Sequence, residues 1–168
     1  MATIYLSLGS NLGDRAQNIA RAVQALGARG VRVTRQSSLY ETEPVDVRGG
    51  GWFLNGVIAA ETKLQPRQLM QTLLIIERSL GRKRRAVSGG PKEPRTIDID
   101  ILLFGSTVSS EPELQIPHPR MAERKFVLVP LAEIAAGTEH PVLKKTIAEL
   151  LADSQDSSEV RMWPGSPS

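Results

Sequence analysis

One stretch of the sequence, "RTIDIDILLFG" at residues 95–105, alternates hydrophobic with acidic residues. Isoleucines at positions 97, 99 and 101 are typical of the buried face of a strand. Asp98 and Asp100 lie between them and, because side chains alternate across a strand, share the opposite face. Positions two apart in a strand lie roughly 6.5–7 Å from each other. The two carboxylates can therefore converge on one site.

Two interpretations of this acidic pair are open. Two charged carboxylates in a sheet are costly without a cation, and Mg²⁺ typically takes one or two carboxylates together with substrate phosphates. Alternatively, both aspartates face solvent on an ordinary two-sided strand, which is the better reading of an isolated D-x-D motif.

A basic cluster just before the aspartates bears on that choice. Residues 82–85 read "RKRR", and Lys92 and Arg95 follow. Taken alone, such a run is more often a solvated surface or a nucleic-acid patch. Arginine, however, matches phosphate oxygens with a fork of donors. Beside paired aspartates, the cluster indicates a site for a metal-bound polyphosphate.

The segments around this stretch predict an α+β fold. Residues 3–8, 31–40 and 52–61 have strand patterns, and the opening stretch supplies a fourth strand. Helical spacing covers residues 14–26 and 66–80. The order β-α-β-β-α-β predicts a ferredoxin-like core, one antiparallel sheet with flanking helices. Further on, we expect a helix around residues 127–135 and a short one that Thr146 caps.

Composition narrows the class of protein. The chain has 168 residues, which suits one domain, and it has no cysteine, which excludes disulfides and thiolate metal sites. The start has no signal-peptide pattern, and no apolar run approaches the ~20 residues that span a bilayer. The net charge of +3 is mild and by itself implies no nucleic-acid partner. We expect a soluble, cytoplasmic monomer that binds neither membrane nor nucleic acid.

Two further polar residues have competing interpretations. His118, in "PHPR", is either a structural loop residue or, with Arg120 and Arg124 nearby, a phosphate donor. Asn55 lies among apolar neighbours in the third predicted strand. It either marks a bulge or edge, or its amide reads a heterocycle with a donor and an acceptor.

Four segments together resemble the 6-hydroxymethyl-7,8-dihydropterin pyrophosphokinases of folate biosynthesis. They are "YLSLGSNLGDR" (5–15), "YETEPV" with "FLNGVI" (40–45 and 53–58), "IERSLGRKR" running to "PRTIDIDILLFG" (76–105), and "IPHPRMAERKFVLVPLAEIA" (116–135). The segments around the aspartates and around His118 are highly specific in combination.

The resemblance implies transfer of the β,γ-diphosphate of ATP to the hydroxymethyl group of the dihydropterin, with AMP as the other product. Asp98 and Asp100 would hold two Mg²⁺ ions, and Arg82 and Arg95 would act on the transferring group. The residues implied to bind ATP are Glu77, Arg84, Ile101, Leu114, His118 and Arg124. Those implied to line the pterin pocket are Thr42, Val45, Phe53, Asn55 and Phe126. The enzyme domain would cover residues 1–152, followed by a mobile, serine-rich tail at 153–168.

The sequence departs from the family pattern at two places, one of which is Leu74, where some members have a glutamine. Many members have a Trp-Gly pair where this chain has Lys92 and Glu93. Two other functions compete with the resemblance. A ferredoxin-like sheet with a basic loop could bind RNA, although the predicted strands lack the expected aromatic pattern. A metal-dependent phosphodiesterase could use the same aspartates to hydrolyse a nucleotide.

Overall fold

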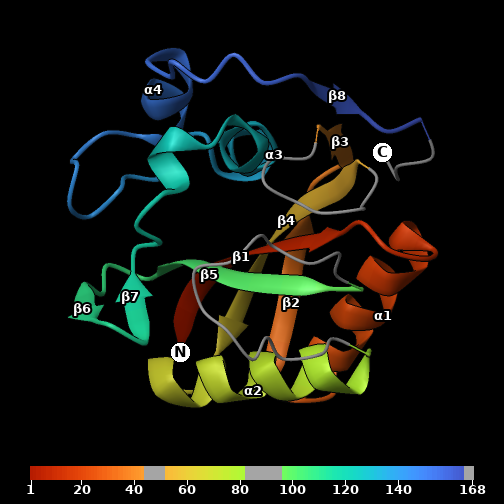
Figure 1. The fold of residues 1–168 in the computed structure, drawn as a ribbon. Coiled ribbons are helices and arrows are strands. Elements are labelled where there is room, and N and C mark those ends of the chain that lie inside the picture. The colour runs from red at the N-terminus through yellow and green to blue at the C-terminus, as the bar shows by residue number, and fades with distance from the viewer. Residues whose placement is uncertain (44–51, 82–95, 165–168) are drawn as a thin grey trace.

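The computed structural model describes residues 1–43, 52–81 and 96–164. Its elements form three layers, with an antiparallel sheet in the middle (Figure 1). Two long helices cover one face of the sheet, and the helices of the C-terminal third lie against the other face. The predicted α+β class, with an antiparallel sheet and flanking helices, is therefore confirmed.

The elements follow the predicted order. The strands are β1 (Ala2–Ser10), β2 (Val31–Gln36), β3 (Tyr40–Thr42), β4 (Phe53–Thr62), β5 (Asp98–Phe104), β6 (Ser109–Glu111), β7 (Leu114–Ile116) and β8 (Val160–Met162). The helices are α1 (Arg15–Gly27), α2 (Pro66–Ser79), α3 (Lys125–Ala135) and α4 (Ile147–Ala152), with a 3-10 turn at Met121–Glu123. The predicted strand at 31–40 is divided into β2 and β3.

The sheet is built around β4. Its strand order is β5-β1-β4-β3-β8, and β2 also pairs with β4. Both β2 and β3 run along the same side of β4, β3 beside its start and β2 beside its end. The separate β6–β7 hairpin follows β5. In this order β5 is an edge strand, and within the described ranges β1 is its strand partner.

Local signals set the helix ends. The Asp14 side chain accepts a hydrogen bond from the backbone NH of Gln17 at 3.1 Å and caps α1. Pro66 opens α2, where a fixed φ suits the first turn. Gly81 follows α2 with φ of +99°, a conformation that favours glycine. Thr146 caps α4 in a capping box with Glu149, as predicted.

Two hydrophobic clusters lie on opposite faces of the sheet. The larger packs alternate residues of the strands against α1 and α2, and includes Ile4, Leu6, Leu8, Ile19, Leu26, Leu69, Leu73, Ile76, Ile97 and Ile99. The smaller packs the other face against α3 and α4, and includes Val57, Leu103, Val127, Leu128, Leu131, Ile147 and Leu150. The isoleucines of the opening stretch thus anchor β5 to the larger core.

A register shift in β5 ends the acidic alternation. Tyr5 of β1 lies opposite Leu103, whereas Leu6 lies opposite Ile101, so Leu102 is an extra residue. Such a bulge lets both Leu102 and Leu103 join the smaller core. The acidic face of β5 therefore stops after Asp100, where the hydrophobic packing against α3 begins.

Glu133 of α3 fixes the short strand β3. Its carboxylate accepts hydrogen bonds from the Tyr40 hydroxyl at 2.6 Å and from the backbone NH of Ser38 at 3.0 Å. Burial of Tyr40, together with its hydrogen bond to Glu133, raises the pKa of its hydroxyl to about 12. Tyr40 therefore stays a neutral donor at ordinary pH, and α3 holds β3 against the centre of the sheet.

The C-terminal segment lies against the body over the residues that the structure describes, while the predicted mobility of residues 153–168 stays a prediction. In residues 153–164 the chain runs over α3 and forms β8, which pairs with β3 (Figure 1). The backbone NH of Trp163 donates to the carbonyl of Leu39 at 2.9 Å, and the Trp163 ring packs against the larger core. Although the segment is mostly polar, Trp163 gives it one hydrophobic contact with the core.

No helix in the described ranges has both the length and the apolar character that a bilayer span requires.

Docking of the tail predicts a loss of stability in Trp163→Ala. Full truncation of a buried Trp costs about 3–5 kcal/mol. Because Trp163 is half-buried, we expect the free energy of unfolding to fall by about 1–2 kcal/mol in urea titrations. The control is Met162→Ala, since Met162 is 58% exposed, and its effect should stay within about 0.5 kcal/mol. Equal stability of the two variants would show that Trp163 does not anchor the tail.

Candidate active site

Two cavities meet at the acidic face of β5. The first, of about 440 Å³, lies between α2, the outer edge of β5 and the β6–β7 hairpin. The second, of about 670 Å³, lies over the opposite face of the sheet, below the start of α3 and residues 153–158. Asp98, Asp100 and Arg124 line both cavities. These three residues therefore stand where the contents of the two cavities would meet.

Glu77 fixes the wall of the first cavity. This residue of α2 is buried, and its Oε2 accepts a hydrogen bond from the backbone NH of Ile99 at 2.7 Å. Because β1 pairs with the other side of β5, the Glu77 carboxylate binds this NH on the outer side of the strand. The bond ties α2 to β5 one residue from each aspartate.

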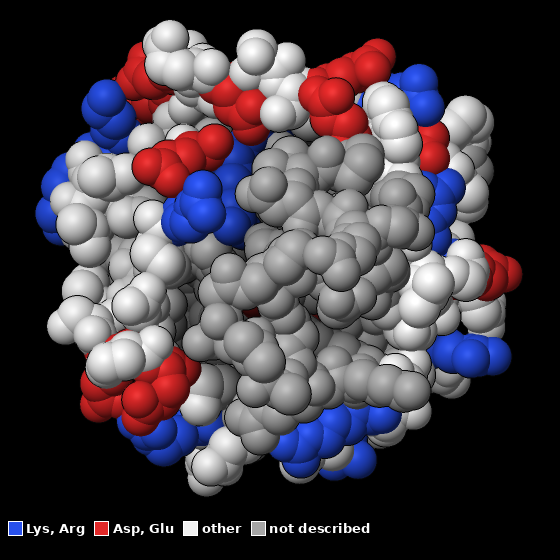
Figure 2. Space-filling view, viewed as in Figure 1, with Lys and Arg blue, Asp and Glu red and all other residues white. Residues whose placement is uncertain are grey.

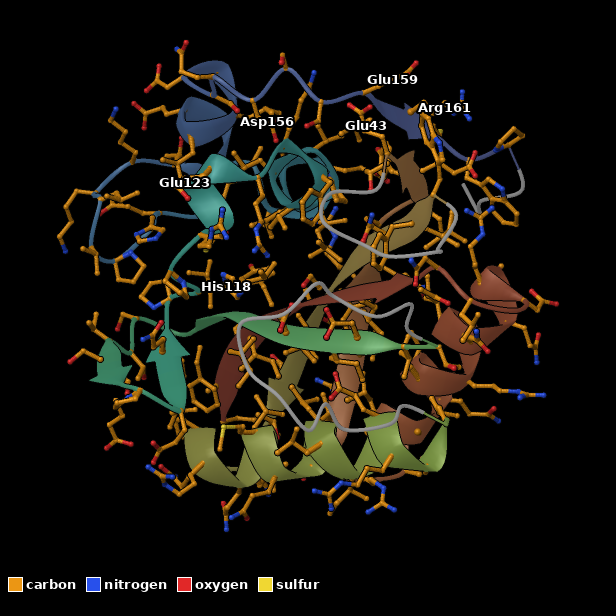
Figure 3. The ribbon with its side chains drawn as sticks, viewed as in Figure 1. Glu43, His118, Glu123, Asp156, Glu159 and Arg161 are labelled. Atoms are coloured by element: carbon orange, nitrogen blue, oxygen red, sulfur yellow. The ribbon has the colours of Figure 1, made fainter. Side chains whose placement is uncertain are left out.

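His118 stands at the mouth of the first cavity with a defined orientation (Figure 3). Its backbone NH donates to the carbonyl of Leu102 at 3.0 Å. Its Nδ1 accepts the backbone NH of Arg120 at 3.1 Å. In the neutral imidazole the proton is therefore on Nε2, which makes that nitrogen the hydrogen-bond donor.

Asn55 lies at the base of the second cavity. Its Nδ2 donates to the Thr42 hydroxyl at 2.8 Å, across the β3–β4 pair. Its Oδ1 faces Gly9 of β1, and a Cβ added at Gly9 would lie only 2.8 Å from that oxygen. Because Gly9 has no side chain, the Asn55 amide can lie against the backbone of β1.

Phe53 and Phe126 add aromatic surface to the second cavity. Phe126 lies at the start of α3, and the Arg124 guanidinium lies 5.6 Å from the centre of its ring. A flat aromatic face beside an amide with a donor and an acceptor suits a planar, polar heterocycle.

Arg124 is a positively charged residue that lines both cavities. Burial, followed by the charge of Arg120, lowers the pKa of the Arg124 guanidinium, while the charges of Asp100 and Asp98 act in the opposite direction. An arginine stays protonated despite such a shift. Arg124 therefore presents a partly desolvated positive charge, which strengthens its attraction for phosphate oxygens.

The two aspartates fit a hard cation whose other ligands come from a substrate. Both are half-buried and project from one face of β5 into the shared zone of the cavities. Within the described ranges, no three or more His, Cys, Asp or Glu side chains are grouped to hold a metal. Two carboxylates without further protein ligands match Mg²⁺ that binds substrate phosphates.

The structure brings together every predicted site residue that it describes. The five implied to bind ATP line the first cavity: Glu77, Ile101, Leu114, His118 and Arg124. The four implied to bind pterin line the second: Thr42, Phe53, Asn55 and Phe126. Their roles stay predictions. Val45, Arg82, Arg84 and Arg95, like the Lys92-Glu93 substitution, lie outside the described residues.

Sequence reasoning missed several residues that line the second cavity. Ser7 and Gly9 face it because they pair with Asp100 and Asp98 across β1. The alternation of β1 could have placed them on this face. Glu43, Arg120 and Glu123 surround it, as do members of the C-terminal segment: Asp153, Ser154, Gln155, Asp156 and Ser158. No local signal in the sequence places the C-terminal residues there. In Figure 2, acidic side chains gather along the upper edge of this view.

Comparison with known proteins agrees with this geometry. Residues 5–136 match the sequence model of the 7,8-dihydro-6-hydroxymethylpterin-pyrophosphokinase (HPPK) family. A 2-amino-4-hydroxy-6-hydroxymethyldihydropteridine pyrophosphokinase of Methylorubrum extorquens is 42% identical over 163 residues, which cover 96% of this chain and 99% of the relative. The enzyme of the same name from Bacillus subtilis is 41% identical, with 95% and 89% covered.

Longer proteins also contain a region similar to this chain. The chain spans 19% of the folic acid synthesis protein fol1 of Pneumocystis carinii, at 41% identity over 86% of this chain. Among solved structures, Plasmodium falciparum HPPK-DHPS superposes with a TM-score of 0.72 at 17% identity, over 90% of this chain and 45% of the other. At that identity the likeness shows the fold alone.

The family match, the bacterial relatives of nearly equal length and the paired cavities agree. The chain belongs to the 7,8-dihydro-6-hydroxymethylpterin-pyrophosphokinase family.

Proposed function

We propose that this chain transfers the diphosphate of ATP to the hydroxymethyl group of 6-hydroxymethyl-7,8-dihydropterin, as a step of folate biosynthesis. The observation that carries the proposal is the meeting of two cavities at Asp98, Asp100 and Arg124. One cavity holds the predicted nucleotide residues and the other the predicted pterin residues. A transfer between two bound substrates requires such a junction.

In the second cavity, the Asn55 amide and the Thr42 hydroxyl would bind the polar edge of the pterin. In their mutual hydrogen bond, Nδ2 of Asn55 donates to the Thr42 hydroxyl. The Phe126 ring would stack on the flat face of the pterin, with Phe53 beside it. In this proposal the hydroxymethyl group would lie toward the two aspartates, which also line this cavity.

In the first cavity, the triphosphate would extend from the β6–β7 side toward the junction. His118 would donate to phosphate through Nε2, and Arg124 would neutralise charge near the second cavity. Ile101 and the backbone at Leu114 would border the adenine. Glu77 would act through the backbone of β5, because its carboxylate already accepts the Ile99 NH.

Asp98 and Asp100 would hold Mg²⁺ along the triphosphate, and we propose two ions. When bound, Mg²⁺ neutralises the phosphate charge and lowers the pKa of a coordinated hydroxyl. The chain itself contributes orientation and fixed charge, which are the main requirements of phosphoryl transfer.

The proposed reaction is a displacement at the β-phosphorus of ATP. A bond forms between the hydroxymethyl oxygen and Pβ, while the bond between Pβ and the oxygen bridging to Pα breaks. AMP leaves with the electron pair, and the hydroxyl proton passes to water. The described parts of both cavities come from one chain, so we propose that the enzyme works as a monomer. A cytoplasmic location stays a prediction.

The identity of the nucleotide product tests the function directly. With Mg²⁺, ATP and the pterin, we expect AMP and the pterin diphosphate in equal amounts, measured by chromatography. Accumulation of ADP would instead indicate transfer of a single phosphate. AMP formed equally fast without pterin would indicate the competing hydrolase. The RNA-binding alternative is less favoured, because helices cover both faces of the sheet and leave a cavity rather than an open platform.

The metal role predicts that Asp98→Asn and Asp100→Asn each reduce turnover by about 100-fold or more, since fixed charge at a reacting group is commonly worth that much. The melting temperature should change little, because both side chains face cavities rather than the core. A suitable control is Glu61→Gln, which removes a carboxylate that pairs with Arg32 on the surface. Wild-type turnover in Asp100→Asn would refute the metal role.

The close approach of Gly9 to Asn55 predicts a selective loss of pterin binding in Gly9→Ala. The new methyl group would displace the Asn55 amide oxygen. We expect the pterin Kd to rise about tenfold, equivalent to roughly 1.4 kcal/mol, while binding of a Mg–ATP analogue is unchanged. Calorimetry measures both. In the control Gly27→Ala, a Cβ would meet nothing within 4 Å, so neither affinity should change. A parallel loss of both affinities would mean that the sheet itself is disturbed.

A further inference from the structure

The C-terminal segment lies on the body of the protein as an extended chain. Between Ser154 and Val160, half-buried residues alternate with exposed ones at every position. Such a period of two is typical of an extended chain with one face against a surface. Asp156 is on the inward face and lies beside the start of α3 (Figure 3). Its carboxylate therefore faces the body, although the segment is polar.

Both oxygens of Asp156 accept backbone hydrogen bonds. Oδ2 accepts the NH of Lys125 at 2.9 Å, and Oδ1 accepts the NH of Ser158 at 2.9 Å. Burial by itself would raise the pKa of Asp156, but the hydrogen bonds from Ser158 and Lys125 outweigh it and lower the pKa. The residue is thus a carboxylate at neutral pH, with one oxygen on its own segment and the other on α3.

The bond to Lys125 satisfies an NH group that α3 leaves without an acceptor. Lys125 is the first residue of α3, and the preceding residue, Arg124, makes no side-chain capping bond. The first NH groups of a helix have no partner within the helix. Asp156, 31 residues further along the chain, takes the place of a local cap.

The position of this bond connects it with the site. Arg124 and Phe126 are the direct neighbours of Lys125, and both line the second cavity. Asp156 also lines that cavity. A shift in the start of α3 would therefore move the Phe126 ring and the Arg124 guanidinium together, along with the wall beside them.

Other contacts hold the segment in one register. The NH of Glu159 donates to Glu43 Oε1 at 3.2 Å. Arg161 lies 3.6 Å from a Glu41 carboxylate oxygen and 4.3 Å from the centre of the Trp52 ring. Together with the β3–β8 pair, these contacts place Asp156 at one defined point on the body.

We propose that Asp156 is a positioning residue for pterin binding, which holds the start of α3 so that Phe126 and Arg124 face the second cavity. The inference rests on the proposed function, because it assigns the second cavity to the dihydropterin. It makes the C-terminal segment part of the substrate pocket rather than a disposable tail.

The test compares Asp156→Ala and Asp156→Asn with the control Glu159→Gln in the full-length chain. Glu159 lies on the exposed face of the same segment, and its backbone NH donates to Glu43 Oε1. The control removes the same charge and leaves the Lys125 bond intact. For each protein, binding of 6-hydroxymethyl-7,8-dihydropterin and of a non-hydrolysable Mg–ATP analogue is measured by calorimetry, together with kcat, KM and the melting temperature.

We expect Asp156→Ala to raise the pterin Kd and KM by about tenfold, the change that a loss of roughly one buried hydrogen bond to a charged group produces. The affinity for the ATP analogue should change much less. Asp156→Asn keeps one acceptor oxygen and should fall between Asp156→Ala and the wild type. Glu159→Gln should match the wild type.

Three results would overturn the inference. The first is an unchanged pterin Kd in Asp156→Ala with a lowered melting temperature, which would make the role purely structural. The second is an equal loss in Glu159→Gln, which would indicate a general effect of charge. If Asp156→Ala does not fold, a wild-type pterin Kd in Asp156→Asn with a wild-type melting temperature also overturns it. Failure of the wild-type protein to bind pterin is a separate outcome, since it rejects the proposed function itself.

Discussion

The hydrogen bond from the Ile99 NH to the Glu77 carboxylate is the constraint on which the site depends. Among the described strands, β5 is an edge strand, and none of them pairs with its outer side. A buried carboxylate from α2 takes that place at Ile99, while isoleucines pack the same region against the larger core. The strand is thereby held from its edge and from one face. The other face is left to Asp98 and Asp100, which can be presented without disturbing the fold.

Because side chains alternate along each strand, the neighbouring strands β1 and β4 also present residues on the face of Asp98 and Asp100. Ser7 and Gly9 lie opposite Asp100 and Asp98 in β1, and Asn55 lies opposite Gly9 in β4. Residues far apart in the sequence therefore share one surface, which α3 covers only in part. The bulge at Leu102 marks the boundary, because beyond it β5 contributes hydrophobic side chains to the packing against α3. One sheet face thus serves as core at one end and as a site at the other.

Helix α3 is positioned by contacts at both of its ends. Near its C-terminal end, Glu133 binds Ser38 and Tyr40 and so joins the helix to β3. At its first residue, Asp156 accepts the Lys125 NH. Phe126 and Arg124 lie next to this second attachment, and both line the cavity over the sheet. The same elements that complete the fold therefore also define the walls of the site.

The sequence by itself determined the fold class, the order of elements and the acidic pair. Periods of two and 3.6, cap residues such as Thr146, and the alternation of Ile and Asp at 97–101 are local signals, so they can be interpreted without coordinates. The motifs also identified the family, and with it several of the residues that line the two cavities.

Tertiary structure alone decided how those residues meet. Three features of the site depend on strands that pair across long sequence separations. They are the position of one cavity beside α2 and of the other below α3, the Glu77 bond at the edge of β5, and the fit of Gly9 against Asn55. The C-terminal segment is the clearest case in which the sequence did not predict the contacts that the structure shows. Its polar, serine-rich composition predicts mobility, since it offers little apolar surface to bury. In the described residues 153–164, the position of the segment rests on contacts of Asp156, Arg161 and Trp163 with partners between 31 and 124 residues away. No local pattern encodes such long-range pairing.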